Sequence, residues 1–173
     1  MLIVFAGLPG TGKTTIAREL ARRLGAVYVR IDSIEFALRE SGRVPGAMED
    51  AGYRVAYAVA EDNLRAGLTV VADSVNPIQL TRDAWRAAAA RAGAPLVEVE
   101  VVCSDVDEHR RRVETRPLEF AGWTLTWQEV VDREYHAWDR DHLVLDTADT
   151  APDRHVDDLL AIVGRPQHPR KGS

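Results

Sequence analysis

Three things are scarce in this chain of 173 residues: cysteine, lysine and long apolar runs. Its single cysteine, Cys103, excludes an internal disulfide framework and is typical of a protein kept in a reducing cytosol. Cys103 ends an apolar run, so we expect a buried structural thiol rather than a nucleophile. No apolar stretch approaches the roughly 18 residues that a membrane-spanning helix needs, and no signal-peptide pattern fits the first residues. We therefore expect a cytoplasmic protein.

The charge pattern is also uneven. The chain carries 27 acidic and 22 basic residues, a net charge of −5, which does not indicate a general nucleic-acid or membrane surface. Only two of the basic residues are lysines, Lys13 and Lys171. Where arginine fills nearly every other cationic position, a lysine in the folded body marks a place that needs a compact ammonium. Because Lys171 lies near the C-terminal end, Lys13 is the lysine that requires an explanation.

Residues 7–14, Gly-Leu-Pro-Gly-Thr-Gly-Lys-Thr, match the phosphate-loop pattern G-x-x-x-x-G-K-[ST] at every fixed position. They follow the apolar run at 2–6 and precede a stretch at 15–24 whose apolar residues recur at helical spacing. Glycines let successive backbone N–H groups surround phosphate oxygens, and the start of a helix adds its positive dipole end. Residue frequencies in this chain give such a match by chance in roughly one case in a thousand. The pattern predicts a nucleotide-binding site.

This loop assigns roles to its own residues. Lys13 would contact the β- and γ-phosphates of ATP, and the Thr14 hydroxyl would bind Mg²⁺. The residues predicted to bind the nucleotide are Gly7, Pro9, Gly10, Thr11, Gly12, Lys13, Thr14 and Thr15. ATP and Mg²⁺ are therefore the expected cofactors.

Strand-like and helix-like runs alternate along the whole chain. We expect strands at 2–6, 26–31, 68–72, 96–103 and 143–145. We expect helices at 15–24, 34–39, 48–65, 78–92, from 104 or 105 to about 116, at 126–138 and at 152–163. Repeated β-α units imply a parallel sheet with right-handed crossovers and helices on both faces, an α/β/α sandwich. Residues 164–173 are expected to form a disordered tail.

Four segments in a fixed order resemble the small P-loop kinases, a group that includes shikimate and gluconate kinases, chloramphenicol phosphotransferase and the bacterial ATP-binding proteins known as AAA-type ATPases. They are residues 7–14, the turn at 31–33, the strand end at 71–73 and the stretch 112–117. The resemblance covers about residues 1–163 and implies an α/β P-loop NTPase fold with a five-stranded parallel sheet of order 2-3-1-4-5. It also implies a helical lid at about 112–126 and transfer of the ATP γ-phosphoryl group to a hydroxyl of a small molecule.

Two carboxylates follow expected strands, where ligands bind in such sheets. Asp32 matches the position at which these kinases place the carboxylate that accepts the proton of the acceptor hydroxyl. The alternative is a helix N-cap, since Asp32 and Glu35 have the spacing of a capping box. Asp73 resembles the carboxylate that holds Mg²⁺, and a cap or turn residue is the alternative.

Three arginines are candidates for the phosphate side. Arg112 and Arg116 lie four residues apart on one expected helix, which directs both guanidinium groups to the same side. They resemble lid arginines that stabilise charge on the transferring group, and a solvated basic face is the alternative. Arg133 is a further candidate for contact with phosphate or adenine. The rest of the stretch 127–138 has the spacing of ordinary core packing, and the histidines lack the spacing of a metal site.

The acceptor stays open at this point. The turn at 73–77 lacks the glycine motif of shikimate kinases, and Ser33 and Ile34 follow Asp32 in place of a second acid. Candidates are an antibiotic or other metabolite, a sugar acid, a nucleoside and a polynucleotide 5′ end. The last needs a basic channel, which a net charge of −5 disfavours, so nucleic acid is an unlikely partner. A non-catalytic ATP sensor is the remaining class, and a sensor needs neither Asp32 nor lid arginines.

Overall fold

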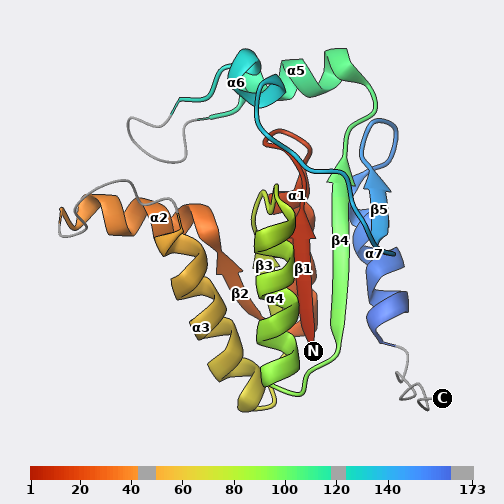
Figure 1. Cartoon of the computed structure of the whole chain (residues 1–173). Helices are drawn as coiled ribbons and strands as arrows, with labels where there is room; N and C mark the ends of the chain where they lie inside the picture. Colours follow the sequence, from red (N-terminus) through yellow and green to blue (C-terminus); the bar gives the residue numbers. More distant parts are fainter. Residues whose placement is uncertain (43–49, 118–123, 165–173) are drawn as a thin grey trace.

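The computed structural model describes residues 1–42, 50–117 and 124–164. Within them, five parallel strands form one sheet in the order β2-β3-β1-β4-β5 (Figure 1). The strands are β1 (Leu2–Ala6), β2 (Val27–Arg30), β3 (Val70–Asp73), β4 (Leu96–Val102) and β5 (Leu143–Asp146). The predicted strand order, with β1 at the centre, is confirmed.

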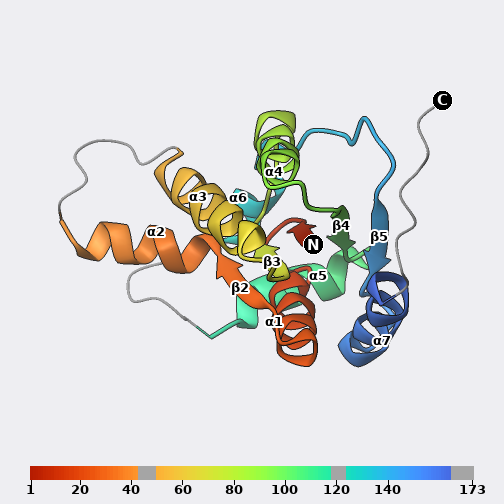
Figure 2. The same ribbon diagram turned by 90° about the horizontal axis from the view of Figure 1, so that it is seen from below.

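Seven helices accompany the sheet in the described part of the chain: α1 (Lys13–Leu24), α2 (Ile31–Glu40), α3 (Ala51–Arg65), α4 (Gln79–Arg91), α5 (Val106–Thr115), α6 (Trp127–Val131) and α7 (Pro152–Val163). Viewed from below, α1 and α7 lie on one face of the sheet and α3 and α4 on the other (Figure 2). Helices α5 and α6 lie above the carboxyl ends of the strands (Figure 1).

The central strand β1 is buried on both faces. Its five residues are shielded from solvent, as a parallel strand covered by two helical layers must be. Ile3 and Phe5 pack in the cluster that includes α1 and α7, whereas Leu2 and Val4 pack in the cluster that includes α3 and α4. Cys103, just after β4, is also buried, as expected.

Helix boundaries follow local signals in several places. The Asp105 side chain accepts a hydrogen bond from the Glu108 backbone and caps α5, which confirms a start at 104 or 105. Pro152 opens α7, where its missing N–H costs nothing. Gly25 ends α1 with a φ of 60°, a left-handed conformation that glycine adopts without strain.

The expected helix at 126–138 is wrong beyond its first turns. Thr126 and Glu129 form a capping box that starts α6, but the helix ends at Val131. Further along, the carbonyl groups of His136 and Ala137 accept hydrogen bonds from the Arg82 guanidinium. These two carbonyl groups therefore bind the Arg82 side chain of α4 and not the backbone amides of a helix. Residues 132–142 therefore carry no regular structure.

Other expected boundaries shift or lie partly outside the described residues. The helix expected at 34–39 starts earlier, at Ile31, so it includes Asp32. Helix α3 is described from Ala51, and the expected residues 48 and 49 lie outside the described part. The same holds for 118–123 of the expected lid and for the tail from 165 onward. None of the described helices is both long and apolar enough to span a membrane.

Candidate active site

A cavity of about 1420 Å³ is lined by residues that follow the carboxyl ends of β1, β2 and β3 and by Arg112 of α5. It brings together most of the residues that the sequence singles out. These are Pro9, Gly10, Gly12, Lys13, Thr14, Thr15, Asp32, Arg112, Arg116 and Arg133. Gly7, Thr11 and Asp73 are not among the residues that line it.

Three glycines give the loop between β1 and α1 its shape. Gly7, Gly10 and Gly12 have φ values of 138°, 86° and 89°, where side chains are strained. A Cβ at Gly7 would also overlap the carbonyl oxygen of Val101, and one at Gly10 would overlap Val113. The loop can pass this close to β4 and α5 only because these positions lack side chains.

Lys13 begins α1 directly after this loop and is only 7% exposed. Among the residues that the structure describes, no hydrogen-bond or ion-pair partner contacts its ammonium group. A buried charge without a partner is costly, so this position is suited to an anionic ligand that brings the missing charge. The neighbouring Thr14 and Thr15 line the same cavity.

Two residues that the sequence analysis missed brace the loop from outside. The Thr147 hydroxyl, just after β5, donates to the Thr11 carbonyl oxygen at 2.8 Å. His109 of α5 lies with Nε2 2.8 Å from the Pro9 carbonyl oxygen and packs edge-on against Trp127. Thr147 could have been found, because it follows a strand at the binding edge of the sheet. His109 carries no such signal.

Arg112 is held beside the loop by two partners. Its Nε donates to Glu108 at 2.8 Å, and its two terminal nitrogens donate to the hydroxyl and the carbonyl oxygen of Thr147, both at 2.9 Å. Hydrogen bonds from Arg111 and, second, from Arg112 lower the pKa of Glu108 to about 2, so this carboxylate stays ionised. The guanidinium is thereby oriented before any ligand binds.

Arg116 lies just past the end of α5, with extended backbone angles of −63° and 138°. The expectation that Arg112 and Arg116 share one helical face is therefore wrong in detail, because α5 ends at Thr115. Both side chains nevertheless line the cavity. Arg133, two residues past α6, also lines it, and its charge acts on Glu35 of α2.

Asp32 is the second residue of α2, and its side chain is 34% exposed. Arg30 donates to its carboxylate at 3.3 Å. The N-cap of α2 is Arg30, and no side chain forms a cap hydrogen bond there. The capping alternative for Asp32 is therefore wrong, because the helix starts before this residue rather than after it.

Asp73 ends β3 at the same edge of the sheet and is 2% exposed. Its carboxylate accepts a hydrogen bond from the Tyr28 hydroxyl at 2.6 Å and lies 3.8 Å from Nε of Arg30. Burial, and then the charge of Asp73, raises the pKa of Tyr28 well above its usual range. Arg30, which the sequence analysis also missed, thus lies between the Asp32 and Asp73 carboxylates.

No group of three or more His, Cys, Asp or Glu side chains that could hold a metal occurs among residues 1–42, 50–117 and 124–164. The Thr14 hydroxyl and the Asp73 carboxylate are oxygen donors of the kind that Mg²⁺ prefers. Mg²⁺ bound with so few protein ligands would take phosphate oxygens and waters as the others. The Thr14 hydroxyl lines the cavity and fits a metal that arrives with a nucleotide. The buried Asp73 carboxylate does not line the cavity and would hold such a metal through water.

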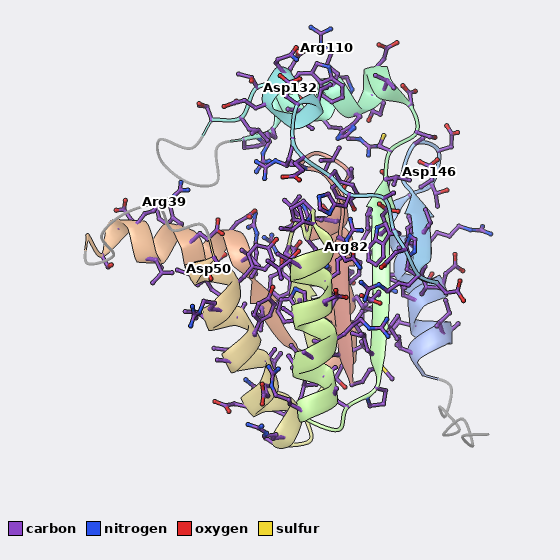
Figure 3. All side chains as sticks on the ribbon, in the orientation of Figure 1. Arg39, Asp50, Arg82, Arg110, Asp132 and Asp146 are labelled. Carbon is purple, nitrogen blue, oxygen red and sulfur yellow. The ribbon has the colours of Figure 1, made fainter. Side chains whose placement is uncertain are left out.

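The turn between β3 and α4 is fixed by a buried arginine. Arg82, 1% exposed, donates to the carbonyl oxygens of Asn76 and Pro77 on one side and of His136 and Ala137 on the other. Figure 3 shows its side chain inside the molecule, near the upper end of α4. The arginine thereby ties the segment that follows Arg133 to the turn that forms one wall of the cavity.

Comparisons with known proteins show which family and which folds the chain resembles. A family model described as an AAA domain matches residues 2–133. A candidate adenylate kinase of Pyrococcus furiosus is 49% identical over 47 residues, and the match spans 27% of this chain and 25% of that protein. The chain thus matches only a quarter of the length of this relative.

Solved structures resemble the whole chain. A candidate kinase from Chloroflexus aurantiacus has a TM-score of 0.73 at 19% identity, with 94% of this chain and 95% of that chain covered. The APS kinase of Mycobacterium tuberculosis, solved with AMPPNP and APS, has a TM-score of 0.72 at 21% identity, with coverage of 95% and 97%. At these identities the likeness shows the fold, which is the predicted α/β P-loop fold.

Proposed function

The chain belongs to the AAA domain family, and we propose that it is an ATP-dependent phosphotransferase that moves the γ-phosphoryl group to a hydroxyl of a small-molecule acceptor. One observation carries this proposal: a single cavity is lined by the phosphate loop with Lys13 and by the Asp32 carboxylate. A nucleotide sensor needs only the first of these. Transfer to a hydroxyl needs both.

On the phosphate side, the loop amides and Lys13 bind the β- and γ-phosphates. Arg112 and Arg116 line the same space and stabilise negative charge on the transferring group. Thr14 and Asp73 are the residues that would hold Mg²⁺, which neutralises phosphate charge when it is bound.

On the acceptor side, the hydroxyl oxygen attacks the γ-phosphorus while the bond to the ADP oxygen breaks. The hydroxyl proton passes to the Asp32 carboxylate. Arg30 orients this carboxylate through its hydrogen bond at 3.3 Å. Because Arg30 also lies beside Asp73, one guanidinium links the proposed base to the proposed metal ligand.

The names of the related proteins support a phosphoryl-transfer function. An adenylate kinase and an APS kinase are both kinases, and the APS kinase structure holds a nucleotide analogue together with APS. They do not share one acceptor, so the acceptor of this chain depends on its own cavity.

A screen for acceptor-dependent ADP release tests the proposal. The full chain is incubated with ATP, Mg²⁺ and a library of hydroxyl-bearing metabolites and antibiotics. We expect at least one compound to raise ADP release, and Lys13→Ala to abolish that rise while its circular dichroism stays native. Tight ATP binding without any acceptor-dependent turnover would contradict a kinase and favour a sensor.

A further inference from the structure

The wall opposite the phosphate loop is largely apolar. Tyr53 and Tyr57 of α3 line it together with Ile78 and Leu80. The Tyr53 hydroxyl accepts a hydrogen bond from the Asn76 backbone, and the Tyr57 hydroxyl donates to the Thr81 carbonyl oxygen. Each hydroxyl makes one hydrogen bond with the backbone, and the two rings lie with Ile78 and Leu80 along the cavity. Leu80 is 74% exposed at its edge.

A carboxylate faces this wall from α2. Glu35 lines the cavity and lies directly over Gly52 of α3, where an added Cβ would overlap the Glu35 side chain. Glycine inside a helix is unfavourable, and here it makes room for the approach of Glu35. No hydrogen bond or ion pair joins the Glu35 carboxylate to any other described residue.

Charged groups around Glu35 come from two elements. Asp32 and Arg39 lie on its own helix, and Arg133 acts from the segment past α6. Burial and, second, the negative charge of Asp32 raise the pKa of Glu35. The positive charges of Arg39 and Arg133 lower it, but by less. A cation bound beside Glu35 would offset this cost of burial.

Arginines on the acceptor side already stand beside carboxylates. Arg30 lies between Asp32 and Asp73. Arg54 of α3 lies 3.7 Å from Asp50, which is labelled just below α2 in Figure 3, and both side chains are about three-quarters exposed. Lys13, Arg112 and Arg116 belong to the phosphate side. Arg133 also lines the cavity, and its charge acts on Glu35. An anionic acceptor would therefore compete with the carboxylates for the arginines of the acceptor side.

The acceptor half combines an aromatic and aliphatic wall with the Glu35 carboxylate, which has no hydrogen-bond or ion-pair partner among the residues that the structure describes. We propose that Glu35 determines acceptor specificity. It binds a protonated amine of a hydroxyl compound whose apolar or ring-shaped body lies on Tyr53 and Tyr57. This inference rests on the proposed phosphotransferase function and names its substrate class, an amphipathic amino alcohol or amino sugar.

Matched acceptor pairs test the inference. Each pair is a hydroxyl compound with a free amine and the same compound with that amine acetylated. We compare kcat/KM within each pair for the native chain, for Glu35→Gln, and for Glu40→Gln at the exposed end of the same helix. The native chain and Glu40→Gln are expected to prefer the free amine by about tenfold or more.

Glu35→Gln should reduce that preference to near unity, mainly through KM, while the acetylated compound is turned over at a rate within a few-fold of native. An unchanged preference in folded Glu35→Gln would overturn the inference, and so would a native preference for acceptors that carry a carboxylate or phosphate. In both cases the phosphotransferase function would stand. If no hydroxyl compound of any charge is phosphorylated, the proposed function falls and this inference with it.

Discussion

The two halves of the cavity recognise their ligands by different means. On the phosphate side, consecutive backbone groups of residues 7–14 form the binding surface. The side chains of Thr147 and His109 hold this loop in place through contacts with its carbonyl oxygens. On the acceptor side, isolated side chains from α2, α3 and the turn after β3 form the surface. The loop of the phosphate side is made by local sequence. The acceptor side is made by packing and combines apolar side chains with carboxylates and arginines.

This difference has a practical meaning. The backbone of the phosphate loop can bind any nucleotide that presents phosphates in the right arrangement. If the acceptor binds as proposed, its recognition depends on side chains brought together by packing, and we expect single substitutions there to change the substrate. We therefore expect changes on one side to leave binding on the other side largely intact.

Among substitutions that affect one half of the cavity and not the other, we expect the largest loss of activity at Asp32. Asp32→Asn should lower acceptor phosphorylation by about 10²-fold or more, because the amide cannot take the hydroxyl proton. Nucleotide affinity, measured by titration calorimetry, should stay within a few-fold of native. Since Asp32 makes no cap hydrogen bond, neither Asp32→Asn nor Asp32→Ala should change thermal stability much. Ser33→Ala, at the exposed neighbouring position, is the control.

Native transfer rates in a folded Asp32→Asn variant would remove Asp32 from the mechanism. Loss of nucleotide affinity equal to the loss of transfer would instead show that the two halves do not act separately.

A smaller effect is expected at Asp73. Asp73→Asn should weaken the Mg²⁺ dependence of turnover more than it weakens nucleotide binding measured without metal. The amide oxygen can still accept the hydrogen bond from Tyr28, so the variant should stay folded. Tyr28→Phe is the matched control: it should cost about 1 kcal/mol of unfolding free energy and leave the Mg²⁺ titration unchanged. Identical Mg²⁺ titrations for Asp73→Asn and the native chain would show that Asp73 only supports the fold.

The smallest effect concerns the pH dependence of stability at Glu35. Burial raises the pKa of this carboxyl above its ordinary value of 4.5, so the folded state binds the proton more tightly than the unfolded chain. The resulting stabilisation is present at low pH and is lost as the pH rises through the folded pKa. Glu35→Gln should therefore melt at a higher temperature than the native chain near neutral pH. That gain should vanish below the unfolded pKa.

Melting curves of the native chain, Glu35→Gln and Glu40→Gln between about pH 4 and pH 8 measure this difference. A gain in Glu35→Gln that is the same at every pH would contradict a buried ionised carboxylate on the acceptor side.

The same contrast explains what the sequence could predict. A contiguous pattern identified the loop and Lys13, and alternating elements predicted a parallel sheet. Asp32 was predicted from its place after a strand and from the resemblance to the small P-loop kinases. The same resemblance led to Arg112 and Arg116, and all three residues line the cavity.

What was missed comes from contacts between distant segments. Nothing in the sequence around Arg82 indicates a special role. In the structure its guanidinium binds the carbonyl groups of His136 and Ala137, which lie in the segment expected to be helical up to residue 138. Glu35 was considered only as a capping partner, because its approach to Gly52 depends on how α2 packs on α3. Neither contact follows from the residue's own neighbours in sequence.

The central claim is that the γ-phosphoryl group passes from ATP to a hydroxyl bound on the acceptor side. The most direct measurement uses γ-labelled ATP, Mg²⁺ and an acceptor found in the screen, and quantifies ADP, inorganic phosphate and labelled acceptor in one separation. We predict equal amounts of ADP and of a labelled phosphoester of the acceptor, with little labelled inorganic phosphate. ADP formed together with an equal amount of labelled inorganic phosphate, and an unlabelled acceptor, would contradict the account.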